Sequence, residues 1–141
     1  MPDDILASLS IEQRTDRWRH TIPYDQVGTF VAIADGELVG FSSAGHNRSE
    51  EGDTVGELYT IYVLEEASGK GIGTKLIEAA EAWMIERGFT EALLWVLASN
   101  TNARAFYASR GWTDDRFEKT EVVWGAAIVE ARYREHLIEH E

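Results

Sequence analysis

The sequence contains no cysteine, which excludes disulfides, thiolate metal ligands and a cysteine nucleophile. Proline occurs only twice among the 141 residues, and no tract rich in serine or glycine marks a linker. Long apolar runs are also missing. The longest, Ala92 to Ala98, is about a third of the ~20 residues that a membrane-spanning helix needs. We therefore expect residues 1–141 to form a single cytoplasmic domain without a membrane segment.

Positive charge is scarce in this sequence. It contains 13 Lys and Arg residues against 25 Asp and Glu residues, so the formal net charge is −12. Binding to nucleic acid or to anionic membrane requires basic side chains that replace the counterions of phosphate groups. The composition therefore argues against both kinds of partner, while 44% apolar residues are enough for a folded core.

The pattern of apolar residues predicts helices and strands in mixed order. Helical spacing is expected from Asp4 to Ile22, and again from Ile72 to a stop at Gly88. A third, shorter helix is expected over Asn102 to Arg110. Strands are expected at Thr29–Ala34, Glu37–Ala44, Thr54–Leu64, Ala92–Ala98, Arg116–Val123 and Ala127–Arg134, with tight turns at Asp35-Gly36 and Trp124-Gly125. This order predicts an α/β chain of the α+β kind, with a mixed sheet flanked by helices.

A glycine-rich turn, Ser68-Gly69-Lys70-Gly71-Ile72-Gly73-Thr74, lies between a predicted strand and a predicted helix. Successive glycines allow backbone N–H groups to converge, and the helix adds unpaired N–H groups and the positive end of its dipole. The spacing matches neither the P-loop nor the dinucleotide-binding fingerprint. Taken alone, the segment is either a phosphate site or an ordinary glycine-rich turn.

A second segment, Asn100 to Trp112, follows the buried strand and narrows this choice. The two segments together resemble the signatures of the GCN5-related N-acetyltransferase (GNAT) superfamily. These are Gln/Arg-x-x-Gly-x-Gly/Ala, at Ser68 to Gly73, and Asn-x-x-Ala-x-x-Phe/Leu-Tyr-x-x-x-Gly-Phe/Trp, at Asn100 to Trp112. Glu57 to Val63 is similar to the strand that leads into the glycine turn in that family. The resemblance covers Thr29 to Leu137.

The resemblance implies a mostly antiparallel GNAT-like sheet and transfer of an acetyl group from acetyl-CoA to a primary amine of a small molecule, peptide or protein. It implies direct attack in a ternary complex, with Tyr107 as the general acid and Glu57 as the general base acting through water. It further implies that the Val63 N–H polarises the acetyl carbonyl. The cofactor-binding residues that it implies are Tyr62, Val63, Ser68, Gly69, Lys70, Gly71, Ile72, Gly73, Thr74 and Asn100.

Each of these roles has a structural alternative. Tyr107 could be a packing aromatic, Glu57 a solvated carboxylate and Asn100 a helix cap. Ser68 stands where the family has Gln or Arg, which removes one side-chain contact to the phosphates. A non-catalytic acyl-CoA-binding sensor or assembly module remains the alternative function. No metal site is expected, since the pattern from His136 to His140 fits a solvated tail.

Two further expectations concern the edge of the sheet and the acceptor. The resemblance leaves no room at the N-terminus for the family's first strand and first helix, so both are expected to be absent. Their absence would expose a sheet edge and apolar surface, which predicts either a homodimer or an unstable protein. Between Asp35 and Glu66 there are eight acidic residues and one basic residue, Arg48, which favours a cationic amine as the acceptor.

Overall fold

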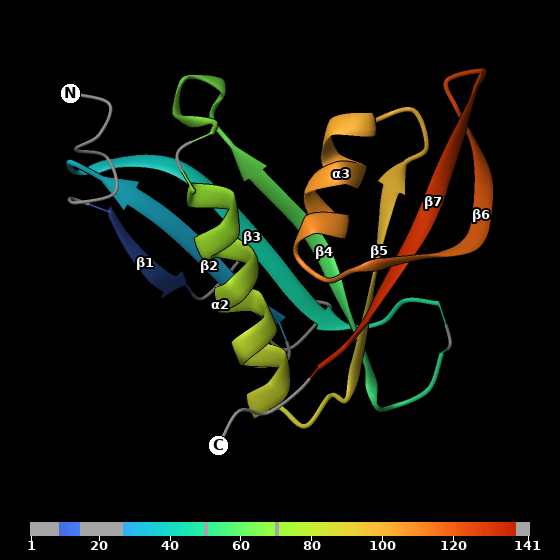
Figure 1. The fold of residues 1–141 in the computed structure, drawn as a ribbon, viewed down its shortest axis with the longest axis horizontal. Helices are drawn as coiled ribbons and strands as arrows, with labels where there is room; N and C mark the ends of the chain where they lie inside the picture. The colour runs from blue at the N-terminus through green and yellow to red at the C-terminus, as the bar shows by residue number, and fades with distance from the viewer. Residues whose placement is uncertain (1–8, 15–26, 50, 70, 138–141) are drawn as a thin grey trace.

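The computed structural model describes residues 9–14, 27–49, 51–69 and 71–137. Its centre is a seven-stranded mixed sheet with the order β1-β2-β3-β4-β5-β7-β6 (Figure 1). All neighbouring strands are antiparallel except β4 and β5, which run parallel. The strands are β1 Leu9–Arg14, β2 Val27–Ala34, β3 Glu37–His46, β4 Val55–Val63, β5 Glu91–Leu97, β6 Thr113–Val123 and β7 Ala126–His136, and the helices are α2 Ile72–Glu86, α3 Thr101–Ser109 and the 3-10 helix η2 Glu65–Ala67.

The first strand corrects two of the sequence-based expectations. Residues Leu9–Arg14 form β1, which pairs along β2, so a helix over Asp4 to Ile22 is wrong for this part and the first strand is not absent. The reason is a period of two: Leu9 and Ile11 are half-buried against the core, whereas Ser10 and Glu12 are exposed. The rest of the expected helix, and the question of an absent first helix, fall on residues outside the described ranges. The edge of β2 that was expected to be exposed is therefore covered by β1.

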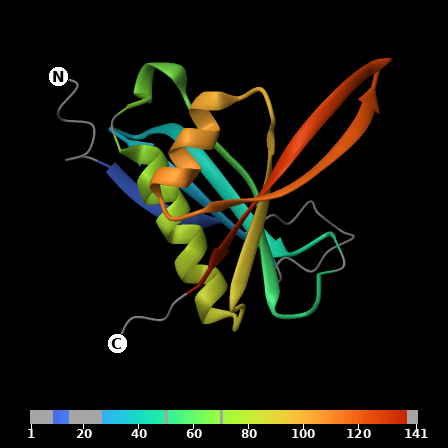
Figure 2. The ribbon, with the colours of Figure 1, turned by 45° about the vertical axis from the view of Figure 1, so that its right-hand side comes forward.

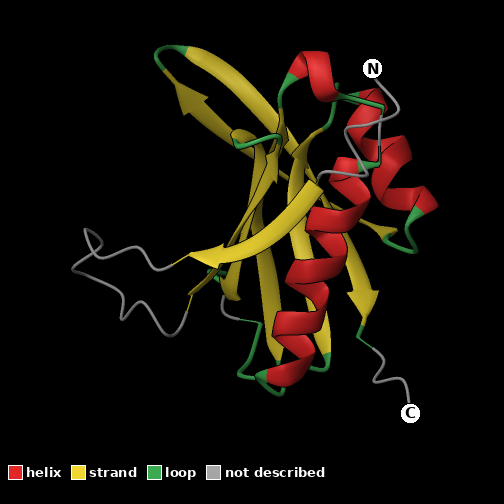
Figure 3. Ribbon diagram, turned by 90° about the vertical axis from the view of Figure 1, so that its left-hand side faces the viewer, coloured by secondary structure: helices red, strands yellow, loops and turns green. Residues whose placement is uncertain are grey.

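Both helices of the described chain pack on one face of the sheet (Figure 3). The apolar side of α2 is fully buried on β2, β3 and β4, because Leu76, Ile77 and Met84 recur at helical spacing. Two glycines allow this close approach. A Cβ on Gly28 would lie 2.6 Å from the ring of Trp83, and one on Gly56 would lie 2.8 Å from the sulfur of Met84. The fold class predicted from the sequence, α+β with a mixed and mostly antiparallel sheet, is confirmed.

The last two strands form a ribbon that projects from the sheet (Figure 2). β7 pairs with β5 as far as Glu130, and the Val129 carbonyl still accepts from the Ala98 N–H, so residues 120–128 pair only across the ribbon. Its turn is the predicted one, since Trp124 and Gly125 have φ of 52° and 81°. The ribbon exposes apolar side chains: Trp124 is 100% and Val122 73% exposed. No described helix is long and apolar enough to cross a membrane.

Two glutamates connect α2 to the last strand. Glu135 on β7 lies against Glu81 on α2, whose carboxylate accepts a hydrogen bond of 3.1 Å from the indole of Trp112. Burial, together with the hydrogen bond and the charge of Glu81, raises the pKa of Glu135 to about 9. Glu135 is therefore protonated at neutral pH, and its hydrogen bond with Glu81 joins the helix to the sheet.

This pair predicts a pH dependence of stability. A folded-state pKa above the unfolded value means that the folded form binds the proton more tightly, so the contribution is complete below about pH 4.5 and is lost as the pH rises to about 9. Thermal melts between pH 5 and 9 should show wild type losing stability relative to Glu135→Gln, which is neutral throughout. The same dependence of melting temperature on pH in both proteins would contradict the raised pKa of Glu135.

Candidate active site

The site begins where the two parallel strands separate. β4 and β5 pair with each other only from Val55↔Glu91 to Leu58↔Leu94. Beyond these residues β4 continues to Val63 and β5 to Leu97 without pairing with each other. The register between β3 and β4 shifts at the same place, so that Tyr59 forms a bulge. Figure 1 shows the two strands diverging, with α3 over the opening. The β5-facing edge of β4 is therefore available to a ligand beyond Leu58.

The opening continues into a cleft of about 720 Å³ between β4, the glycine turn and α3. No acidic or basic residue of the described chain lines this cleft. The absence of carboxylates suits an anionic ligand, and the apolar walls suit a thioester and its arm. The lining residues are Ile61, Tyr62, Val63, Ser68, Gly69, Gly71, Gly73, Thr74, Asn100, Asn102, Ala103, Phe106 and Tyr107.

The glycine turn forms one end of the cleft. Gly69 and Gly71 have φ of 77° and 86°, a left-handed conformation in which a side chain is strained. Gly71 is the N-cap of α2, and the first turn of that helix contains no acidic residue. Its N–H groups and dipole thus favour an anion at this end. Ser68 donates to the carbonyl of Leu64 at 3.2 Å, so its hydroxyl serves the turn.

α3 forms the other wall of the cleft. Asn100 caps this helix: its Oδ1 accepts a hydrogen bond of 3.1 Å from the Ala103 N–H, which leaves the amide NH₂ to face a ligand. Tyr107 is buried among Phe106, Trp112 and Tyr133, at ring distances of 5.5 to 6.4 Å. Burial raises the pKa of Tyr107 to about 12, so its hydroxyl is protonated at neutral pH.

A second and smaller pocket, of about 340 Å³, lies on the opposite face of the sheet. Alternation along the strands explains its position: Leu58 and Leu94 face α2, so Glu57 and Trp95 face the other way. Three glutamates and two basic residues line it. Its residues are Arg48, Ser49, Glu57, Tyr59, Trp95, Lys119, Glu121 and Glu130.

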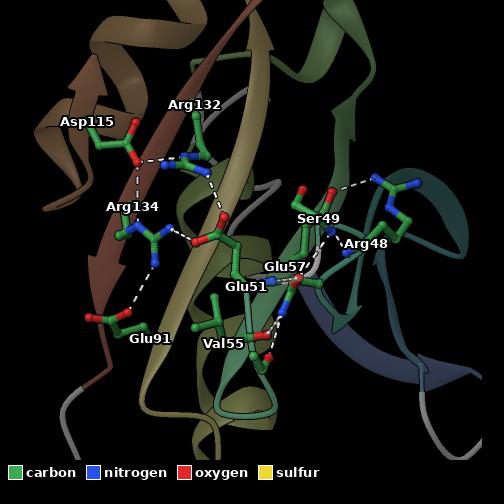
Figure 4. Close-up of polar contacts among 11 residues, drawn as sticks. Arg48, Ser49, Glu51, Val55, Glu57, Glu91, Asp115, Arg132 and Arg134 are labelled. Atoms are coloured by element: carbon green, nitrogen blue, oxygen red, sulfur yellow. Dashed lines mark hydrogen bonds and ion pairs between the residues drawn. The ribbon is translucent and has the colours of Figure 1, made fainter. Parts of the chain in front are cut away.

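Glu57 is 1% exposed and both of its oxygens are bonded (Figure 4). Oε1 accepts from the backbone N–H of Arg48 at 2.8 Å, and Oε2 accepts from the Arg48 guanidinium at 2.6 Å. The guanidinium also lies 4.5 Å from the centre of the Tyr59 ring. The hydrogen bond with Glu57 raises the pKa of Arg48. The carboxylate thus has one rigid backbone partner and one charged side-chain partner.

The loop that presents Arg48 is fixed at both ends. The buried Asn47 donates to the carbonyls of Gly52 and Val55 and accepts from the N–H groups of Ser49 and Glu51. Glu51 in turn accepts from Arg132 and Arg134 on β7, at 3.2 and 2.8 Å (Figure 4). Both arginines also donate to Asp115 on β6. The sequence showed only a polar, acidic loop here.

Comparison with the sequence-based prediction separates the residues into groups. Eight of the ten predicted cofactor residues line the cleft; Ile72 is instead buried under the turn, and Lys70 lies outside the described residues. Tyr107 lines the cleft and Glu57 lines the opposite pocket, so the two predicted catalytic side chains lie on opposite faces of the sheet. The residues that the prediction missed are Ile61, Asn102, Ala103 and Phe106. The spacing of Ala103, Phe106 and Tyr107 in the sequence is the signal that could have found Ala103 and Phe106, because it places all three residues on one face of a helix.

Known proteins resemble this chain in sequence and in fold. Residues 3–112 match the Acetyltransferase (GNAT) family. An uncharacterized N-acetyltransferase, YuaI, from Bacillus subtilis strain 168 is 33% identical over 121 residues, which are 84% of this chain and 68% of that protein. The ribosomal-protein-alanine N-acetyltransferase of Brucella melitensis is 27% identical at a TM-score of 0.70, covering 80% of this chain and 70% of that one.

A third relative was solved with a ligand. The PaiA N-acetyltransferase from Thermoplasma acidophilum, in complex with coenzyme A, is 25% identical at a TM-score of 0.58, covering 79% of this chain and 61% of that one. The family match includes both signature segments, the separated strands and all of α3. The chain belongs to the GNAT family of acetyltransferases.

Proposed function

We propose that this chain is an acetyl-CoA-dependent N-acetyltransferase that acts on a primary amine by direct attack in a ternary complex. The observation that carries this proposal is that β4 and β5 separate, and that the sheet has a different pocket on each face at this place. One is an uncharged cleft that ends at a helix N-terminus, and the other contains a buried carboxylate. Acetyl-CoA fits the first, because its pyrophosphate suits the N–H groups from Gly69 to Thr74 and its arm suits the open edge of β4.

The roles of the side chains follow from this placement. In the proposal, the N–H of Val63 donates to the thioester carbonyl and Asn100 donates to the pantetheine arm. Glu57 accepts a proton from the ammonium group of the acceptor, directly or through water, and so produces the free amine that attacks. Tyr107 donates its hydroxyl hydrogen to the departing thiolate; among the described residues this hydroxyl has no other partner.

A non-catalytic acyl-CoA-binding module is the second candidate. It is favoured by one observation, which is that both oxygens of Glu57 are already bonded to Arg48. Binding of acetyl-CoA without release of CoA in the presence of any amine would support this module. Release of CoA that depends on an amine would support the enzyme.

The acceptor is proposed to be a cationic amine of a small molecule or of a peptide or protein. The name of the Brucella relative, a ribosomal-protein-alanine N-acetyltransferase, supports the protein class. Part of the acidic segment is neutralised locally, since Glu51 pairs with two arginines and Glu57 with one. We further propose that residues 1–141 are a single cytoplasmic domain. The described residues contain no cluster of acidic or histidine side chains able to hold a metal ion.

A homodimer is also proposed, and its support now comes from the ribbon rather than from a missing strand. A two-stranded ribbon is marginally stable alone, and this one exposes Val122, Val123 and Trp124 on a part of the chain that β5 does not back. A second copy related by a two-fold axis would cover the same apolar surface on both chains.

The proposed function first predicts that the protein binds acetyl-CoA. At a hundredfold excess over Kd, acetyl-CoA should stabilise the protein by about 2.7 kcal/mol, or roughly 5–10 °C in a thermal-shift assay. Thr74→Glu should abolish the shift without unfolding the protein, because a carboxylate suits a helix N-terminus but repels phosphate. Lys75→Gln makes the same change of charge at an exposed position that does not line the cleft, and it should keep the shift. An equal loss of the acetyl-CoA thermal shift in both variants would contradict binding of the pyrophosphate at the glycine turn.

The second prediction concerns the acid. Tyr107→Phe should lower kcat by about 10²-fold with little change in the Kd for acetyl-CoA, because only the proton donor is lost. The matched control is Tyr133→Phe, which removes a hydroxyl that donates nothing to the cleft and contacts Arg104 instead. Steady-state release of CoA with an amine panel measures both variants. An unchanged kcat in Tyr107→Phe would remove Tyr107 from the acid role.

The third prediction concerns assembly. Wild type should sediment as a dimer, and Trp124→Ser should sediment as a monomer with an unchanged circular dichroism spectrum. Leu38→Ser is the control, since Leu38 is 56% exposed next to the other hairpin turn of the sheet. A wild-type monomer, or the same loss of dimer in both variants, would rule out this interface.

A further inference from the structure

The pairing of Glu57 contains an asymmetry that bears on how an acceptor binds. The side chain of Glu57 is 2% exposed, whereas that of Arg48, its ion-pair partner, is 64% exposed. A buried carboxylate requires a cationic or hydrogen-bonding partner, but an exposed arginine does not. The arginine can leave the pair for water, and the carboxylate cannot follow it.

The two contacts of Arg48 with Glu57 differ in rigidity. The backbone N–H at Oε1 is fixed, because Asn47 holds the loop from inside and Glu51 holds it to β7. The guanidinium at Oε2 is on a long, mostly exposed side chain and packs on the Tyr59 ring. Rotation of that side chain would free Oε2 while Oε1 stays bonded. One oxygen is thus permanently held and the other is exchangeable.

The other charged groups in the pocket are already paired among themselves. Lys119 on β6 lies 3.7 Å from Glu121 and 3.8 Å from Glu130, and its ammonium lies 4.2 Å from the centre of the Trp95 ring. The titratable and charged groups that line the pocket with Glu57 are Arg48, Tyr59, Lys119, Glu121 and Glu130. Oε2 of Glu57 is the deeply buried acceptor atom among them, and Arg48 occupies it.

We propose that Arg48 is a positioning residue that reserves Glu57 for a cation, and that the acceptor's ammonium group displaces the Arg48 guanidinium from Oε2. The inference rests on the proposed acetyl transfer and specifies its acceptor as cationic. The exchange replaces one cation by another beside the same carboxylate, so an uncharged molecule cannot drive it. Once displaced, Arg48 no longer neutralises Glu57, and the carboxylate can take a proton from the ammonium, giving a carboxylic acid and a free amine.

The test measures binding without chemistry. The probe is an alanine tripeptide amide with a free amino terminus, titrated by calorimetry into the full chain saturated with CoA, which has no acetyl group to transfer. Arg48→Gln should bind the probe about fivefold more tightly than wild type, because no ion pair or ring contact has to be broken first. Arg48→Lys should restore an affinity close to that of wild type, and Glu57→Gln should abolish binding.

Lys119→Gln is the matched control, since it removes one positive charge from the same pocket. If removal of positive charge alone tightened binding, Lys119→Gln would match Arg48→Gln, and the proposal would be overturned. Weaker or unchanged binding in Arg48→Gln, including no measurable binding to either protein, would overturn it too. So would equal binding of the N-acetylated tripeptide amide, which carries no ammonium group. Thermal melts of each variant identify any loss of folding.

The two levels of the proposal fail in different ways. If Arg48→Gln tightens binding but no protein releases CoA from acetyl-CoA with any amine, the displacement stands and acetyl transfer is refuted. If wild type acetylates amines but Arg48→Gln binds the probe no more tightly, acetyl transfer stands and the role of Arg48 is refuted.

Discussion

The parting of β4 and β5 is the constraint on which the rest of the site depends. Parallel strands normally satisfy each other's backbone groups, and here that pairing ends at Leu58 and Leu94 while both strands continue. The polar groups on the β5-facing edge of β4 must then be paired by water or by a ligand. The same divergence makes room for α3 and lets the glycine turn face the opening. The cleft is a consequence of where one ladder stops, and the bulge at Tyr59 sets that point.

A second constraint acts on the other face, where a carboxylate is buried. Glu57 is 1% exposed on a central strand, and such a group stays charged only with partners placed beforehand. The chain places them through a series of contacts from the core outward. Asn47 shapes the loop, Glu51 anchors it to Arg132 and Arg134, and the loop brings Arg48 to the carboxylate. The polar network on β7 therefore serves the pocket, although none of its arginines lines it.

The sequence predicted most of the cleft where β4 and β5 separate, but little of the network around the buried Glu57 carboxylate. Runs of β-type and apolar residues and the tight turns between them located β2 to β7 within a few residues. The two signature segments located the cleft, because local patterns determine both. β1 was mistaken for helix because Leu9 fits a helical spacing with earlier residues as well as the alternation of a strand. The Arg48–Glu57 pair could not be predicted: its members are nine positions apart, on a loop and a strand, and only the register of β3 on β4 brings them together.

The linings of the two pockets differ in charge, and this difference suits the ligands proposed for each of them. The cleft has no charged lining in the described chain and relies on backbone N–H groups, which cannot be neutralised by a neighbouring side chain. Five of the eight residues that line the opposite pocket are charged, and these five form ion pairs with one another. The lining of the cleft therefore suits an anion, whereas in the exchange proposed above a cation reaches the Glu57 carboxylate only by replacing the guanidinium of Arg48.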